Sequence, residues 1–330
     1  MNILQYLHGG KNSKLLYFTY GIRLYIIPKC FLRTKLQSIL SSIENRDDKE
    51  YILNRVNYYC KLSEQVKEPK YIQSAKLLQP IQLAYLSNFK LKGNRSTYFL
   101  DTLEFTRWFK SSYKISYLFG DVVTVPQIPT IVKSRPIITE NSNSVLLNLD
   151  KIRHFVFLND KCSFVSKKDI LFFRADLKDK PNRIKFMEMY FNNPMCDLGE
   201  VSASKYLNKE WKKSKITLLS HLKYKFILAL EGNDVASNLK WIMSSNSIAV
   251  MPTPKYETWF MEGCLIPNVH YIEIKEDYSD LIEKLNYYIT HPDSAKQIIE
   301  SANNYVAQFK NKKREKLISI LVLQKYFKEN

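Results

Sequence analysis

Short apolar runs alternate with amphipathic segments along the C-terminal half of the chain. Buried strands are expected at 170–174, 225–232, 247–253 and 270–275. Helical spacing predicts helices at 236–244, 256–265 and 279–290, the last capped by Ser279, and a further helix from Asp293. Strands and helices alternate in this way when crossover helices connect a parallel sheet. We therefore predict an α/β fold.

The N-terminal half shows a less regular pattern. Helices are expected at 37–62, 72–88 and 101–110, and β-rich pieces at 115–125. Three prolines and a polar run over 126–144 predict a long connecting loop.

Domain boundaries follow from the turns and the charge pattern. A turn at 159–163 places a boundary near Val165. The chain ends in a segment with a basic beginning and an apolar helical face. We expect two domains and a terminal basic amphipathic helix, at 1–165, 166–310 and 311–330.

Length, composition and charge narrow the class of protein. A chain of 330 residues fits two domains or one large barrel. Hydrophobic residues at 45% and charged residues at 25% exclude a disordered or fibrous chain. Fifty Lys and Arg against 32 Asp and Glu give a net charge of +18. A polyanionic partner is expected, namely nucleic acid, an anionic membrane surface or a phosphorylated substrate, unless the excess reflects only a biased genome composition.

The cysteines and the apolar segments indicate a compartment. Five scattered cysteines without a C-x-x-C pair argue against a disulfide framework or a zinc site and favour a reducing compartment. The first residues lack the pattern of a signal peptide. The most apolar stretch, Leu15–Leu32, is interrupted by Arg23, Pro28 and Lys29, so no membrane span is expected. A cytoplasmic protein is predicted, with peripheral binding to the inner face of the cytoplasmic membrane.

Common nucleotide-binding motifs are absent from the sequence. Its eight glycines form neither G-x-G-x-x-G nor G-x-x-x-x-G-K-[ST]. The chain also lacks the Asp-x-Asp pair with which many nucleotide-sugar enzymes hold a divalent cation. Nucleotide-diphosphate chemistry would then use protein cations and helix N-termini, without a bound metal, to neutralise the leaving group.

Two places suit an anionic ligand. In 231–237 (EGNDVAS) a strand ends and a helix starts, so backbone N–H groups can point at an anion. Asp234 or Ser237 can instead simply cap that helix. Arg174 ends another strand and Arg183 enters the following helix, so both guanidinium groups can reach one crevice and hold a phosphate. Such arginines are also commonly solvated or ion-paired.

Several motifs carry a resemblance to a known family. They are 117–121 (YLFGD), 132–137 (VKSRPI), 143–150 (NSVLLNLD), 153–155 (RHF), 172–174 (FFR), 231–237 (EGNDVAS), 239–241 (LKW) and 251–262 (MPTPKYETWFME). In these segments the chain resembles glycosyltransferase family 90. That family contains protein O-glucosyltransferases, fungal capsule-associated proteins and bacterial lipopolysaccharide glycosyltransferases, and the similarity is closest to the bacterial branch.

The resemblance implies a fold and a reaction. Family members have the GT-B type of fold, with two Rossmann-like domains facing a cleft. In this chain 1–165 would form the acceptor side and 166–310 would bind a UDP-sugar. The resemblance also implies inversion at the anomeric carbon without a metal, which agrees with the missing Asp-x-Asp.

The resemblance assigns donor-binding roles. Arg174 and Arg183 would neutralise the diphosphate, and Gly232 and Ser237 match the family's donor-binding helix. The family's glycine after the first arginine is an alanine here. The arginine that usually follows the serine is also missing, with Lys240 as the nearest match. Which cation stabilises the leaving UDP therefore stays open.

Direct displacement also needs a general base that takes the proton of the acceptor hydroxyl. The resemblance makes Asp121 the candidate base, with His154 as the alternative. Asp121 can instead be a turn residue, and His154 a packing residue. One of Glu257 and Glu262 is expected to bind ribose or sugar hydroxyls, and the other to be a surface or ion-pair residue.

These observations lead to one main prediction and several alternatives. We predict an inverting, metal-independent glycosyltransferase that needs no cofactor and moves a hexose from a UDP-sugar to a lipopolysaccharide or lipooligosaccharide core. A protein or capsule glycosyltransferase of the same fold is an alternative. A basic nucleic-acid-binding protein is another, although the 22 tyrosines show no stacking motif and no nucleic-acid partner is expected. A non-catalytic membrane scaffold that keeps the fold is the third.

Overall fold

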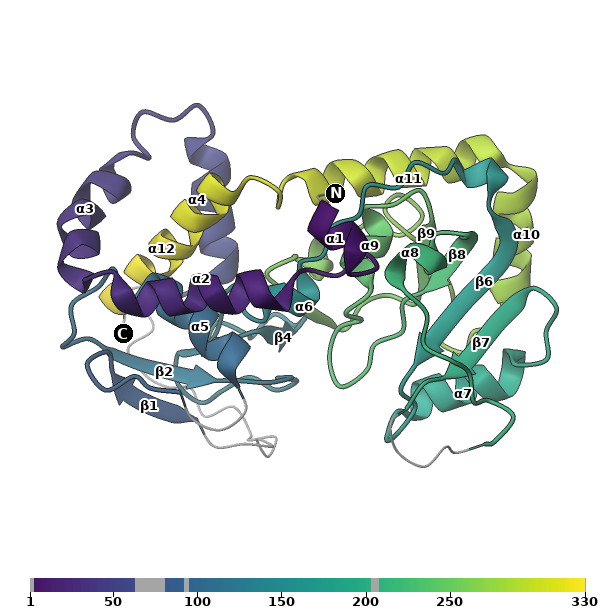
Figure 1. Ribbon diagram of the computed structural model, residues 1–330, viewed down its shortest axis with the longest axis horizontal. Helices are drawn as coiled ribbons and strands as arrows, with labels where there is room; N and C mark the ends of the chain where they lie inside the picture. The colour runs from purple at the N-terminus through teal and green to yellow at the C-terminus, as the bar shows by residue number, and fades with distance from the viewer. Residues whose placement is uncertain (1–2, 63–80, 92–94, 203–207, 330) are drawn as a thin grey trace. The chain divides into compact units, whose positions relative to one another are not determined.

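The computed structural model describes residues 3–62, 81–91, 95–202 and 208–329 (Figure 1). The chain forms two compact units, which we describe separately. Unit 1 comprises Met1–Ser13, Arg153–Pro254 and Cys264–Gln308. Unit 2 comprises Lys14–Ile152, Lys255–Gly263 and Phe309–Asn330. The predicted boundary near Val165 thus falls inside unit 1, and the terminal helix belongs to unit 2.

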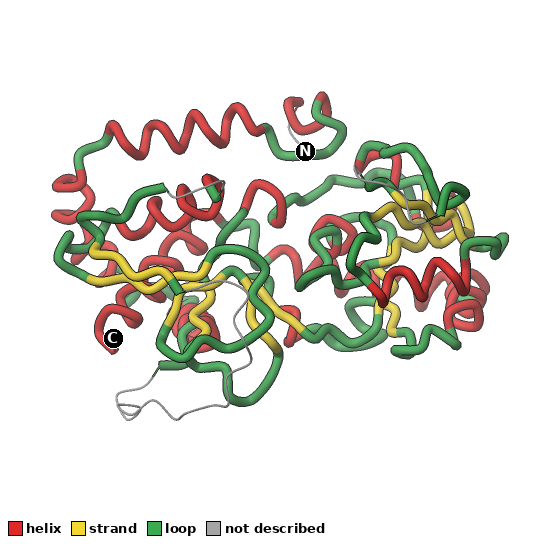
Figure 2. Tube along the Cα trace, turned by 90° about the horizontal axis from the view of Figure 1, so that it is seen from below, coloured by secondary structure: helices red, strands yellow, loops and turns green. Residues whose placement is uncertain are grey.

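Unit 1 contains a parallel five-stranded sheet, seen in yellow in Figure 2. Its strands are β6 (Lys168–Ala175), β7 (Cys196–Glu200), β8 (Tyr224–Leu228), β9 (Ile248–Met251) and β11 (Ile272–Glu273). Their order across the sheet is β11-β9-β8-β6-β7. The chain places β7 on one side of β6 and β8 on the other, so the winding direction changes between β6 and β8. Ligands of open α/β sheets bind outside the carboxyl ends of the strands at such a point.

The helices of unit 1 are α1 (Ile3–Leu7), α7 (Pro181–Tyr190), α8 (Leu218–His221), α9 (Leu239–Met243), α10 (Leu281–Thr290) and α11 (Pro292–Ala307). Of these, α7, α9, α10 and α11 pack against the sheet around an apolar core. Strand residues Phe173, Phe226 and Val250 share one buried cluster with Phe186 of α7 and Leu285 of α10. Strands buried on both faces are almost continuously apolar, which explains why the sequence pattern revealed four of these strands and missed β7, whose sequence is CDLGE. The α/β class and the four predicted strands of this half are confirmed.

Unit 2 contains two smaller sheets. One has the order β1-β2-β3-β5, with strands Gln82–Tyr85, Lys114–Leu118, Thr130–Val132 and Ser144–Leu146, of which only the β1–β2 pair is antiparallel. The other pairs β4 (Ser134–Pro136) with β10 (Tyr256–Thr258). The helices of the unit are α2 (Lys14–Ile26), α3 (Lys29–Ser41), α4 (Lys49–Tyr59), α5 (Ser96–Thr106) and α12 (Lys312–Glu329). The short helix α6 (Lys151–His154) lies at the boundary between the units.

Tertiary contacts explain why some predicted elements were wrong. The helix predicted at 256–265 is instead β10 and a short 3-10 helix at Glu262–Cys264, because residues 256–258 pair with β4. The loop predicted at 126–144 contains β3 and β4 and leads into β5, which are buried three-residue strands between prolines and polar turns.

Other differences are local. The helix predicted at 37–62 is broken into α3 and α4 by a polar turn. Of the helix predicted at 72–88, residues 72–80 lie outside the described part of the chain and Gln82–Tyr85 form strand β1. Asp280, not Ser279, occupies the N-cap position of α10.

Candidate active site

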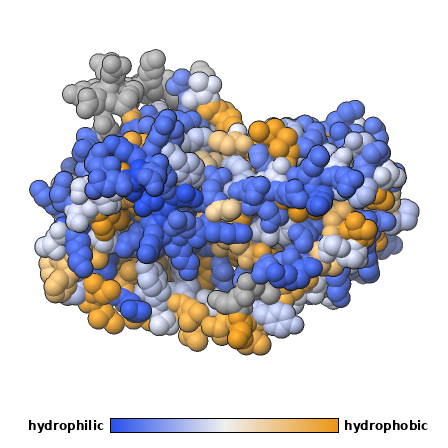
Figure 3. Space-filling view, turned by 90° about the horizontal axis from the view of Figure 1, so that it is seen from above, coloured by the Kyte–Doolittle hydropathy of each residue, from blue (hydrophilic) through white to orange (hydrophobic). Residues whose placement is uncertain are grey.

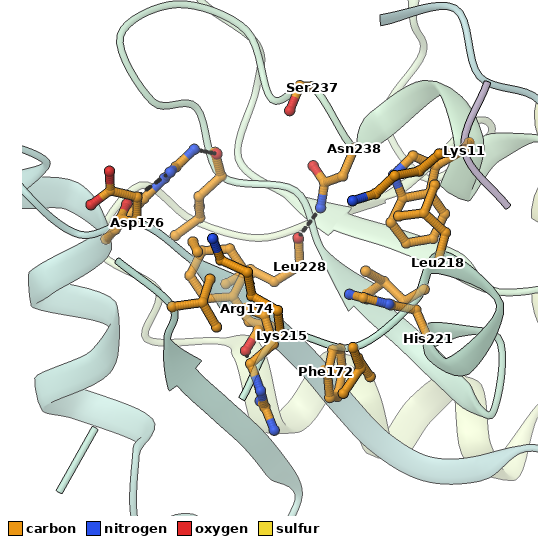
Figure 4. Close-up of a pocket in the computed structure, with 18 residues that line it drawn as sticks. Lys11, Phe172, Arg174, Asp176, Lys215, Leu218, His221, Leu228, Ser237 and Asn238 are labelled. Atoms are coloured by element: carbon orange, nitrogen blue, oxygen red, sulfur yellow. Dashed lines mark hydrogen bonds between the residues drawn. The ribbon is translucent and has the colours of Figure 1, made fainter. Parts of the chain in front are cut away.

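A pocket of about 340 Å³ lies at the winding change of the unit 1 sheet. Ala175 and Asp176 reach it from the carboxyl end of β6, and Leu228 and Leu230 from the end of β8. Figure 4 shows side chains from the sheet and the surrounding loops converging on it. The pocket therefore occupies the position at which open α/β sheets bind ligands.

Positive charge dominates the pocket wall. The cationic side chains Lys11, Arg174, Arg183 and Lys215 line it. Of the described residues in its wall, Asp176 is the single carboxylate. Lys11 and Lys215 enter from different sides (Figure 4), and within the described chain neither ammonium group is paired with a carboxylate. An anionic ligand would be attracted to this wall because it would supply the missing counter-charge.

Two glycines bring Lys11 to the pocket. Gly9 and Gly10 have φ values of 62° and 95°, a backbone conformation that side chains with a Cβ rarely adopt. A Cβ on Gly9 would lie 2.8 Å from the side chain of Thr217, directly before helix α8. The amide of Leu219 in α8 also donates to the Gly9 carbonyl at 3.3 Å. This close packing fixes the N-terminal segment against the pocket, where Lys11 follows.

Arg183 connects the ends of β6 and β8. Its guanidinium donates to the carbonyl groups of Asp176 (3.0 Å), Leu230 (2.9 Å) and Glu231 (3.2 Å). Burial lowers the pKa of Arg183, and no carboxylate in the described residues forms a salt bridge with it. Its charge is therefore met at the edge of the pocket by these carbonyl dipoles and, without a salt bridge, by the nearby Asp176 carboxylate. Gly232 permits this approach, because a Cβ there would lie 2.8 Å from the guanidinium.

The guanidinium of Arg174 binds Asp197, whereas the sequence predicted that it faces a diphosphate. Its guanidinium donates to Asp197 Oδ1 at 2.6 Å and to the Asp197 carbonyl at 2.8 Å. It also lies over the ring of Phe172, 4.4 Å from the ring centroid. Its charged end therefore points along the sheet, and the stem of the side chain forms the pocket wall (Figure 4).

We expect Arg174→Ala to destabilise unit 1, because it leaves the Asp197 carboxylate without its ion partner. The expected loss is about 1–3 kcal/mol in the free energy of unfolding. Denaturant unfolding of Arg174→Ala, Asp197→Asn and the double variant measures it. A coupling energy close to zero between the two substitutions would contradict the structural role of this pair.

Of the other predicted donor-binding residues of unit 1, Ser237 lines the pocket and Lys240 does not. Ser237 lines the pocket with its neighbour Asn238, whose amide donates to the Leu228 carbonyl at 2.9 Å (Figure 4). Lys240 is completely buried in α9, where its ammonium lies 5.8 Å from the ring centroid of Phe155. It is not among the residues that line the pocket.

His221 lines the pocket and was missed from the sequence. Its Nδ1 lies 2.7 Å from the Thr217 carbonyl, so this nitrogen carries the proton and Nε2 can accept. The imidazole makes edge contacts with the rings of Phe172 and Trp241. Burial lowers the pKa of His221, and the nearby charges of Arg174 and Lys11 lower it further. Burial and these charges thus favour the neutral imidazole.

The two candidate bases lie in different units and environments. Asp121 follows β2 in unit 2 and is 24% exposed, with its Oδ1 2.6 Å from the ammonium of the buried Lys133. His154 belongs to unit 1 and is 2% exposed, with Nε2 2.9 Å from an Arg153 nitrogen. Of these two side chains, Asp121 is the one that solvent and an acceptor can reach.

Glu257 and Glu262 are both buried in unit 2. The Glu257 carboxylate accepts from Arg135 Nε at 2.7 Å and from the hydroxyl of Tyr58. Glu262 accepts from the amide of Thr258 at 2.6 Å and from its hydroxyl at 3.0 Å. Both carboxylates thus hold the β4–β10 region together, and their donor-binding role stays a prediction.

Comparison with known proteins places this site in a family. The sequence profile of glycosyl transferase family 90 matches residues 147–328, which include most of unit 1 and the whole sheet of the pocket. The chain belongs to glycosyltransferase family 90. The predicted resemblance is thereby confirmed, and the protein is a glycosyltransferase.

Relatives support the same assignment. O-glucosyltransferase LpsA of Dichelobacter nodosus is 36% identical over 316 residues, which cover 95% of both chains. Protein O-glucosyltransferase 3 of Homo sapiens is 27% identical over half of this family 90 chain and a third of its own length. Protein O-glucosyltransferase 1 of Rattus norvegicus is 25% identical over 42% of this chain and 37% of its own length.

Proposed function

We propose that the family 90 chain transfers a hexose from a UDP-sugar whose diphosphate binds in the unit 1 pocket. The observation that carries this proposal is the set of cations without carboxylate partners at the winding change of a parallel sheet. Lys11 and Lys215 would contact the diphosphate, and Arg183 would add positive potential from the pocket edge. Ser237 would donate a hydrogen bond from the rim, and a GT-B arrangement would present the acceptor from unit 2.

We propose glucose as the sugar and a lipopolysaccharide or lipooligosaccharide core as the acceptor. The names of the relatives support glucose. The 36% identity over nearly the whole chain to a bacterial protein supports a bacterial acceptor, since the human relative matches only half of the chain. The net charge of +18 suits a phosphorylated acceptor. A protein acceptor is the alternative that the human and rat relatives suggest.

In the proposed reaction the acceptor oxygen attacks the anomeric carbon as the bond from that carbon to the diphosphate breaks. The acceptor proton passes to the Asp121 carboxylate, and the electron pair of the broken bond leaves with UDP. The pocket cations stabilise the negative charge that develops on UDP, which lowers the barrier because they are already in place. Attack opposite to the leaving group inverts the anomeric centre.

The proposal is tested by incubating the full chain with several UDP-sugars and with truncated lipopolysaccharide or peptide acceptors. Mass spectrometry would identify the glycosylated product. We expect transfer from UDP-glucose to a core acceptor, with release of UDP. Binding of UDP-sugars without hydrolysis or transfer to either acceptor would instead favour a non-catalytic scaffold, and tight nucleic-acid binding without UDP-sugar binding would favour the nucleic-acid alternative.

We expect transfer to continue when divalent cations are removed. The lysines of the pocket occupy the role that a divalent cation has in metal-dependent enzymes, because they supply positive charge next to the diphosphate. Initial rates with and without EDTA, after dialysis against a chelating resin, measure the effect, which should stay within about twofold. Strict dependence on Mn²⁺ or Mg²⁺ would contradict the metal-free scheme.

A further inference from the structure

Helix α2 has an inner face that fixes it to unit 2. The Tyr17 hydroxyl donates to Asp101 Oδ1 of α5 at 2.9 Å. A Cβ on the buried Gly21 would lie 2.7 Å from the side chain of Leu100, so the two helices are in close contact. Leu24 is 7% exposed on the same side. Spacing of four and three residues puts these three side chains on one face of the helix.

The opposite face of α2 is apolar and open to solvent. Its large side chains are Leu15, Phe18, Ile22, Tyr25 and Ile26, which we call the outer apolar face. They recur at intervals of three and four residues, as on one side of a helix. Leu15 is 77% and Ile26 73% exposed. Helix α2 runs along the outside of unit 2 (Figures 1 and 2), and apolar side chains gather along the lower edge of Figure 3 where this helix lies.

The charges that α2 and α3 themselves carry have one sign. The first 43 residues contain six Lys and Arg residues and no Asp or Glu. At about 100° per residue, Lys14 and Arg23 lie on either side of the outer apolar face. Both are exposed, and Lys35 of α3 is exposed as well. An apolar strip with tyrosine at its border and cations on both sides has the composition of helices that lie in an anionic lipid surface.

The packing of α2 suits a helix that lies on a membrane. Within the described residues, no single helix is long and apolar enough to span a bilayer. Helices α2 and α3 reach the required length and composition only as a pair, which is bent by 96°. Because Tyr17 and Gly21 fix α2 along α5, the side of the helix, and not its end, is available to a membrane surface. A second copy of the chain is poorly suited to cover the outer apolar face, because a symmetric contact would bring the same cations together.

We propose that the outer apolar face of α2 binds an anionic lipid bilayer, with Leu15, Ile22 and Ile26 inserted and Lys14 and Arg23 at the headgroups. The protein would thereby be held at a membrane surface through unit 2. The donor pocket of unit 1 takes no part in this contact, so the inference does not depend on the proposed reaction.

Vesicle flotation of the full chain tests the proposal. We compare vesicles of phosphatidylcholine alone with vesicles that contain phosphatidylglycerol. Wild type should bind the anionic vesicles and lose binding at high salt. The Ile22→Ser, Ile26→Ser variant should bind them about tenfold more weakly or worse. The matched control Val165→Ser, Ile266→Ser changes two exposed apolar residues elsewhere and should bind like wild type.

Three results would overturn the proposal. The first is equal flotation of wild type and the α2 variant. The second is a loss of vesicle binding in the matched control as large as in the α2 variant. The third is vesicle binding that does not depend on the anionic lipid. Sedimentation without vesicles adds a further check, because a wild-type dimer that the α2 variant dissociates would show that a second copy covers this face. Far-UV circular dichroism and UDP titration confirm that each variant is folded, and a lack of UDP binding would affect only the proposed function.

Discussion

Replacing Lys11 and Lys215 together by alanine is expected to weaken UDP-sugar binding by roughly 10²–10⁴-fold, because each ammonium would lose a charge-assisted hydrogen bond of about 1.5–3 kcal/mol. The fold should change little. Both lysines are exposed, and in the described structure their charged ends make no ion pair that the fold needs. Isothermal titration with UDP-glucose measures the affinity, and thermal unfolding measures the stability.

A matched pair of surface lysines separates this effect from a general loss of charge. Lys161→Ala with Lys296→Ala also removes two positive charges from unit 1, at exposed positions outside the pocket. This control should bind UDP-glucose within about threefold of wild type. If both double variants lose affinity equally, the net charge of the protein attracts the donor and the assignment of the diphosphate to Lys11 and Lys215 fails.

Lys11 shows why part of the pocket could not be predicted from sequence. The strand ends, the turn at Gly232 and Ser237 are local features, so the apolar runs and their following residues predicted them. Lys11 is separated from β6 by more than a hundred residues, and it reaches the pocket because Gly9 and Gly10 pack against the start of α8. The pair of glycines before a lysine was the available signal.

Lys240 lies outside the residues that line the pocket, and its donor-binding role stays a prediction. It was chosen because it stands near the serine of the donor-binding segment, yet α9 turns its side chain into the buried interior of unit 1. Neighbours in sequence diverge by about 100° per residue on a helix, so closeness along the chain does not predict a shared pocket. Arg174 lies near the end of β6, as the sequence predicted, but the ion pair with Asp197 of the neighbouring strand determines where its guanidinium lies.

The fold was predictable where burial alone decides it. Strands β6, β8 and β9 of unit 1 contain buried apolar runs, whereas β10 has the spacing of a helix and becomes a strand through its pairing with β4. Arg135 and Glu257 are opposite each other in that pair and form a buried ion pair. The strand conformation of β10 thus depends on a contact between residues 122 positions apart, which local periodicity cannot reveal.

Asp121→Asn is expected to lower kcat by roughly 10²-fold or more while UDP-sugar affinity is retained, because an amide cannot take the acceptor proton. The structure adds a second effect. Lys133 is 1% exposed and its ammonium lies 2.6 Å from Asp121, so the variant also removes an anionic partner from a buried charge. The stability should fall by less than the about 3–5 kcal/mol typical of a fully buried pair, since Asp121 is partly exposed.

A second substitution separates the base from the counter-ion. Lys133→Met removes the buried charge at similar volume, and an apolar replacement of an ion pair is often neutral for stability. The double variant Asp121→Asn, Lys133→Met should therefore regain most of the stability and keep the loss in kcat, whereas Lys133→Met alone should keep its turnover. Near-normal turnover of the double variant would show that Asp121 serves only to neutralise Lys133. The proton would then pass to another group, and the pocket lysines would be unaffected because they lie in the other unit.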